Sequence, residues 1–142
     1  MATDILISIY PELMPKLESG IKNFEFRPFV INDDSITMWL YETKPTKLLN
    51  AVMNVKPAIS VLSDNQHYGL GDNKFYEIIN TGRVAYEITS FRWLDNPIDI
   101  KKIKTYYGLA NAPQNFVYLQ NYPKLLSDLK AQTQHQQSSL DF

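Results

Sequence analysis

The chain has 142 residues, of which 44% are hydrophobic and 20% are charged, as expected of one soluble globular domain with its own core. Its formal net charge of −1 excludes the strongly positive field of proteins that bind nucleic acid without sequence preference. It contains no cysteine, which excludes disulfides, thiolate zinc sites and cysteine nucleophiles.

The first half of the chain alternates patterns of strand and helix. Residues 4–10 predict a largely buried strand, because apolar side chains alternate along them. Pro11 then opens a short helix, since proline suits the first helical turn, and Gly20 ends it. Further strands are predicted over residues 24–27, 35–41 and 46–55.

The second half begins with a polar loop over residues 64–73 and a short helix closed by Gly82. Residues 83–93 form the longest predicted strand, which Asn96-Pro97 is expected to break because proline cannot donate to a ladder. Two helices are predicted over residues 100–107 and 122–131. The glutamine- and serine-rich residues 132–142 predict a disordered tail after a domain spanning residues 1–131.

About five strands and several short helices, without a repeating βαβ pattern, predict an α+β domain built on a curled sheet or barrel. The first residues lack the pattern of a secretory signal, and no apolar run approaches the roughly 20 residues that span a bilayer. We therefore expect a cytoplasmic protein.

Residues 20–27, the motif segment, concentrate charge at the start of a buried strand. Alternate strand residues share a face, so Glu25 and Arg27 point away from the two phenylalanines beside them. Lys22 has the opposite parity and meets them only if the chain is still turning or bulged there. The pair is either an ion pair that steadies the sheet, or Arg27 faces a phosphate or base edge with Glu25 orienting it.

Aromatic and basic residues nearby are candidates for the same ligand. Trp39 and Tyr41 share one strand face and would stack on bases, unless they fill the core. Lys44 and Lys47 would extend a positive rim, and the run at 101, 102 and 104 is either solvated or holds a phosphate backbone. Two further aromatic candidates are Tyr10 and Phe29.

Metal and cofactor patterns are absent from the sequence. Its two histidines fall in a predicted loop and the predicted tail, with no second ligand at metal spacing. Gly69-Leu70-Gly71 lacks the third glycine and the preceding strand of a dinucleotide fingerprint. We predict no metal and no organic cofactor.

The motif segment, together with the strand and helix before it, resembles the ASCH domain, a PUA-like β-barrel family. The family hallmark, Gly-x-Lys-x-x-Glu-x-Arg, is complete here as Gly20, Lys22, Glu25 and Arg27. A looser similarity runs through residues 39–43, 83–93 and 112–116. The resemblance implies a barrel of about five to six strands with short flanking helices and a cleft lined by the hallmark residues.

The resemblance also implies a domain that binds RNA or a nucleotide-like ligand. Asn115 is a further candidate contact, although it replaces the serine of a Pro-Gln-Ser-Phe loop found in many ASCH proteins. One alternative is a hydrolase of ribonuclease or amidohydrolase type acting on RNA or a modified nucleoside, with Lys22 and Glu25 in acid/base roles. Its second carboxylate would be Glu77 or Glu87.

Some ASCH relatives are hydrolases, including a small bacterial branch that removes the acetyl group from N4-acetylcytidine. That branch has a threonine nucleophile where Glu25 stands here, and this departure counts against the same reaction. The other alternative is a non-catalytic interaction or regulatory protein in which the motif segment is purely structural.

Overall fold

The computed structural model describes residues 2–140, with side chains described as far as residue 133. Its strands are β1 (Ala2–Ile9), β2 (Phe24–Arg27), β3 (Ser35–Glu42), β4 (Leu48–Val55), β5 (Val84–Asp99) and β6 (Val117–Tyr118). Its helices are α1 (Met14–Glu18), α2 (Asp72–Ile79), α3 (Ile100–Thr105) and α4 (Pro123–Leu140), with 3₁₀ turns at Pro11–Leu13 and Leu119–Asn121.

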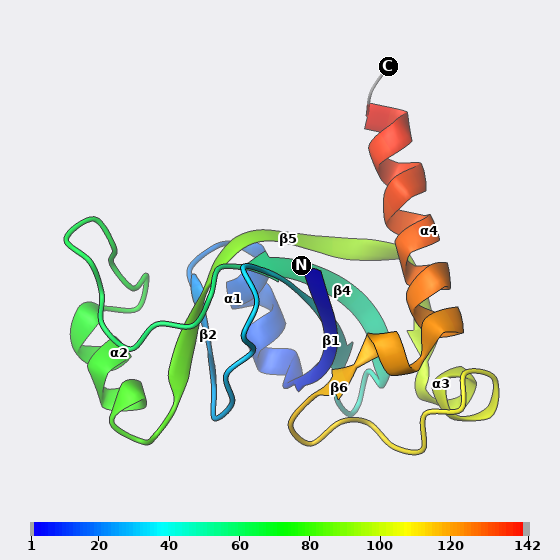
Figure 1. Cartoon of the computed structure of the whole chain (residues 1–142), viewed down its shortest axis with the longest axis horizontal. Helices are drawn as coiled ribbons and strands as arrows, with labels where there is room; N and C mark the ends of the chain where they lie inside the picture. Colours follow the sequence, from blue (N-terminus) through cyan, green and yellow to red (C-terminus); the bar gives the residue numbers. More distant parts are fainter. Residues whose placement is uncertain (1, 141–142) are drawn as a thin grey trace.

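The strands form one six-stranded sheet in the order β2-β5-β4-β3-β1-β6. Strands β1 and β3 are parallel, and the other neighbours are antiparallel. The sheet curls around α1 (Figure 1), because β5 pairs with β2 through its first residues and with β4 through the rest. The predicted α+β, barrel-like class of five to six strands is confirmed.

Both faces of the sheet are buried, which fits the alternation along its strands. One face packs with Met14 and Leu17 of α1, and its strand residues include Ile5, Ile7, Ile9, Met38, Leu40, Met53 and Tyr86. The other face packs under α3 and α4 through Ile103, Leu125 and Leu129, and its strand residues include Leu6, Trp39, Tyr41 and Val52. A third cluster joins β2 to α2 through Phe24, Phe26, Tyr68, Phe75 and Ala85.

Strand β5 differs from its prediction because it continues through Asn96-Pro97 to Asp99. Its pairing with β4 jumps from Ala51↔Trp93 to Leu49↔Ile98. Between these pairs β5 has more residues than β4, so its backbone is locally irregular. Pro97 lies in this stretch, where it does not have to donate a hydrogen bond to β4. Bulges of this kind are where sheets tolerate proline.

Helix α4 continues to Leu140, into the segment predicted as a tail over residues 132–142. The side chains from residue 134 and the whole of residues 141–142 lie outside the described residues, so the boundary at residue 131 stays a prediction. None of the helices in the described part of the chain has the length and apolar character needed to cross a bilayer.

Three different groups cover the outer edge of β1. Strand β6 pairs with Ile5 and Leu6. The amide of Gln120, oriented to match its neighbours, donates to the Asp4 carbonyl at 3.0 Å and accepts from the Asp4 amide at 3.1 Å. Further along, the Ser8 carbonyl accepts a hydrogen bond of 2.8 Å from Nη2 of Arg27. Because Arg27 belongs to β2, this last contact brings two distant strands of the curled sheet together.

Candidate functional site

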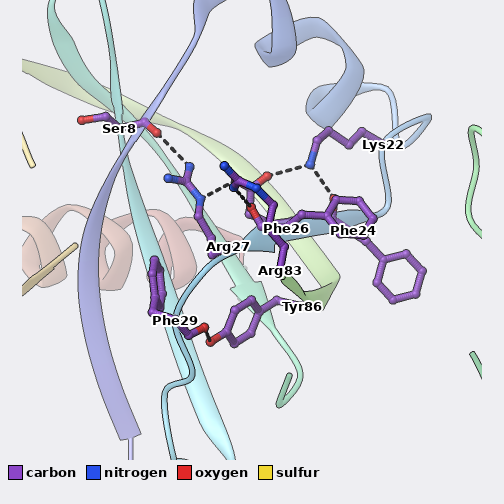
Figure 2. A network of polar contacts seen from close by, with 9 residues as sticks. Ser8, Lys22, Phe24, Phe26, Arg27, Phe29, Arg83 and Tyr86 are labelled. Carbon is purple, nitrogen blue, oxygen red and sulfur yellow. Dashed lines mark hydrogen bonds and ion pairs between the residues drawn. The ribbon is translucent and has the colours of Figure 1, made fainter. Parts of the chain in front are cut away.

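A cavity of about 620 Å³ opens where β2 approaches β1, and we call it the first cavity. Its charged lining residues are Lys22, Glu25, Arg27 and Arg83. Its other lining residues are Ser8, Ile9, Tyr10, Leu13, Phe26, Thr43, Ile78, Ala112, Pro113 and Gln114. The three charged residues of the motif segment therefore line one space. Figure 2 shows Lys22 and Arg27 among the polar contacts there, with Arg27 reaching the Ser8 carbonyl.

Glu25 bridges the two cations of the motif segment. Its Oε1 accepts from Nζ of Lys22 at 2.7 Å, and its Oε2 accepts from Nε of Arg27 at 2.8 Å. Lys22 also donates to the Phe24 carbonyl at 2.5 Å. The turn that parity required of Lys22 is present, because the chain is irregular from residue 21 until β2 begins at Phe24.

The Glu25 side chain is only 5% exposed. Burial by itself raises its pKa, but the charges of Lys22 and Arg27, together with their hydrogen bonds, outweigh burial and hold the pKa below its ordinary value. Glu25 is therefore a carboxylate at neutral pH. Both of its oxygens accept from cations, which makes it a poor proton acceptor for water or substrate.

A loop distant in sequence holds the motif segment in place. The Asn23 side chain donates to the His67 carbonyl at 2.8 Å and accepts from the Gly69 amide at 2.9 Å. Gly69 approaches so closely that an added Cβ would lie 2.0 Å from the Ile21 carbonyl oxygen, so only glycine fits there. On the other side, Phe24 packs edge-on against Phe75 of α2, with ring centroids 5.3 Å apart.

No protein-family model and no curated protein matches the chain. The structure of the ASCH protein of Zymomonas mobilis matches with a TM-score of 0.64 and 19% identity, over 88% of this chain and 94% of that one. Two single-site mutants of that protein, one Tyr-to-Phe and one Ser-to-Ala, match with TM-scores of 0.66 at 21% and 22% identity. Those matches cover 88% of this chain and 97% and 95% of the mutants. The fold is that of an ASCH domain.

The ASCH fold confirms the architecture that the motif segment led us to expect. At identities of 19–22%, the similarity shows a shared fold. Within this ASCH fold, the first cavity is also lined by Arg83, which the sequence did not indicate, and by Tyr10, which it did. Exposed Arg83 donates from Nη1 to the Phe26 carbonyl at 3.2 Å. Tyr10, an aromatic candidate from the sequence, lines the cavity with 66% of its surface exposed. The antiparallel pairing Arg27↔Val84 is what brings Arg83 to the site.

Several other predicted contacts lie elsewhere in the ASCH fold. Trp39 is 2% exposed and its indole donates to Asp4 at 3.2 Å, so it is a core residue that does not border the first cavity. Tyr41, Lys44 and Lys47 line a second cavity of about 390 Å³. Asn115 is exposed but lines neither cavity, unlike the neighbouring residues 112–114.

The remaining candidates are also outside the first cavity. Phe29 packs against Tyr86 and Phe116, with ring centroids 6.1 and 4.5 Å away. Glu77 pairs with Lys74 at 3.7 Å on the surface. Glu87 accepts from Gln66 at 2.5 Å and lies 3.9 Å from Lys56. Neither glutamate lines the first cavity with Glu25.

We expect the contribution of Glu25 to stability to disappear in acid. Its folded pKa lies below the ordinary value of 4.5, so the unfolded chain binds this proton first as the pH falls. The stabilisation is complete above that value and is lost as the pH falls through the folded pKa. Urea unfolding of wild type and Glu25→Gln should show a difference at about pH 7 that shrinks towards about pH 3. A difference independent of pH would contradict this account.

Proposed function

We propose that this ASCH-fold chain binds a nucleotide, free or within a short RNA segment, in the first cavity. The observation that carries the proposal is its charge: Lys22, Arg27 and Arg83 line it against Glu25 alone. Since Glu25 already accepts from Lys22 and Arg27, the excess of positive charge favours a phosphate.

The other walls suit a base and sugar. Phe26, Ile78 and Pro113 supply apolar surface, and exposed Tyr10 supplies a ring on which a base can stack. The volume of about 620 Å³ lies within the roughly 300–1,000 Å³ typical of small-molecule sites. Nη1 of Arg27 has no hydrogen-bond partner among the described residues and is available to a ligand.

Two features favour binding over hydrolysis. Glu25 has both oxygens engaged, and the ammonium of Lys22 is held by Glu25 and the Phe24 carbonyl. An acid/base pair needs one partner ready to accept a proton and the other ready to give one. Here the Glu25 carboxylate and the Lys22 ammonium are paired with each other, which suits an electrostatic role in holding the site together.

The test is calorimetric titration of the four nucleoside 5′-monophosphates into wild type, Arg83→Ala and Tyr10→Ala. We expect at least one monophosphate to bind, and each variant to weaken it about tenfold, the loss of one charged or stacking contact. Both side chains are exposed, so the thermal midpoint should stay close to that of wild type. Arg92→Ala is the matched control, because Arg92 is an exposed arginine of β5 outside both cavities.

The same mixtures, followed over time by mass spectrometry, separate the alternatives. A product that accumulates with wild type and not with Arg83→Ala would favour the hydrolase. Equal affinity of wild type and both variants, or no binding by wild type, would leave the motif segment as a structural element of an interaction protein.

A further inference from the structure

The second cavity adjoins the first. It is lined by Tyr41, Thr43, Lys44, Lys47, Ile100, Lys104, Asn111 and Ala112. Thr43 and Ala112 also line the first cavity, so these two residues form a shared wall. The turn between β3 and β4 therefore stands between two binding spaces on one surface.

Charge is distributed unevenly between these cavities and the rest of the chain. The whole sequence has 14 lysine and arginine residues and 15 aspartate and glutamate residues. Six of the basic residues line the two cavities, against Glu25 as the single acidic one. A nearly neutral chain with this local excess presents one positive surface long enough for a ligand with more than one anionic group.

Lys47 gives a second, independent indication. Its φ of 54° lies in the left-handed region, which residues other than glycine rarely adopt. Its amide donates to the Thr43 carbonyl at 3.4 Å, and its carbonyl accepts from the Ile100 amide at 3.2 Å. These two hydrogen bonds hold Lys47 between Thr43 of the shared wall and Ile100, which also lines the second cavity. The positive φ of Lys47 makes this position conformationally costly. Strain of this kind gathers at functional sites.

We propose that the second cavity binds the phosphate of the next nucleotide, so that the ligand is a single-stranded oligonucleotide of at least two nucleotides. The inference rests on the proposed function, which requires only that one nucleotide enters the first cavity. Cationic side chains and apolar side chains line both cavities, and a single-stranded nucleic acid offers a phosphate and a base at each successive nucleotide.

The test compares uridine 5′-monophosphate with the 5′-phosphorylated dinucleotide pUpU, and repeats the pair with adenine. Wild type should bind the dinucleotide about tenfold more tightly, because it gains one phosphate contact. The double variant Lys44→Gln/Lys104→Gln should bind both ligands with the monophosphate affinity. The slope of log K against log salt should fall by about 0.7 for each lost contact. Lys101→Gln, in the same helix but outside the cavity, is the control.

Each outcome has a distinct meaning. Equal affinity for the two ligands would overturn the second site and leave the proposed function standing. Loss of monophosphate affinity in the double variant would overturn the division into two sites. Equally tight binding of inorganic tripolyphosphate would overturn the assignment to nucleic acid. Failure of every ligand to bind wild type would overturn both proposals.

Lys47→Gly separates a role in binding from a role in folding. Glycine adopts a positive φ without strain, so the midpoint of thermal unfolding should be unchanged or higher. Dinucleotide affinity should nevertheless fall about tenfold, with monophosphate affinity unchanged. Full dinucleotide affinity in this variant would remove Lys47 from the site.

Discussion

Glu25→Ala is expected to lower the free energy of unfolding by about 3–5 kcal/mol, the usual loss when one partner of a buried ion pair is removed. The side chains of Lys22 and Arg27 are only 9% and 13% exposed, so water from the first cavity replaces the lost carboxylate only in part. The variant would hold one buried and one half-buried cation side by side with no anion between them. Repulsion and desolvation then act in the same direction.

Urea unfolding at neutral pH measures this effect. Glu77→Ala is the control, since its pair with Lys74 is exposed and should change stability by less than about 1 kcal/mol. The triple variant Lys22→Met/Glu25→Leu/Arg27→Met removes all three charges together, so it should be more stable than Glu25→Ala alone. A triple variant that is less stable than Glu25→Ala would show that the uncompensated charge is not the cause.

Phe75→Ala should also cost about 3–5 kcal/mol, as large-to-small substitutions of buried aromatic residues do. Phe75 is fully buried. Its ring lies 5.3 Å from that of Phe24 and 5.5 Å from that of Phe26, centroid to centroid. These phenylalanines flank Glu25, so the cavity left by the mutation opens beneath the strand that carries the site.

Chemical denaturation of wild type and variant tests the Phe75 prediction. Phe75→Leu should lose less stability, because it refills part of the volume. Tyr76→Ala is the control on the same helix, since Tyr76 is 38% exposed and should cost less. A loss below about 1 kcal/mol for Phe75→Ala would mean that α2 is held to β2 by other contacts.

Local sequence was sufficient to predict how the charged side chains of the motif segment are arranged. The helix-ending Gly20, the irregular approach at Lys22 and the shared parity of Glu25 and Arg27 are all properties of eight consecutive residues. Each follows from a short-range rule about turns or strand faces. The strands were predicted for the same reason, although β6 was not, because two residues are too few to show a period.

The rest of the site depends on pairings between distant segments. Strand β3 is apolar on both faces, so its sequence does not indicate which face borders the cavity. The answer comes from Ile103 and Leu125, which cover Trp39 from helices more than sixty residues later in the chain. Arg83 joins the site only through the β2–β5 register, and no local pattern reports a register.

The covered edge of β1 has a consequence for how the protein behaves in a crowded solution. An exposed strand edge is a template on which a second chain can add its own strand, and sheets that leave one open are prone to aggregate. Here Gln120, β6 and Arg27 occupy successive backbone groups along that edge. Arg27, which lines the first cavity, thus also occupies a backbone group to which a second chain could otherwise pair, so its replacement should make the protein more prone to self-association.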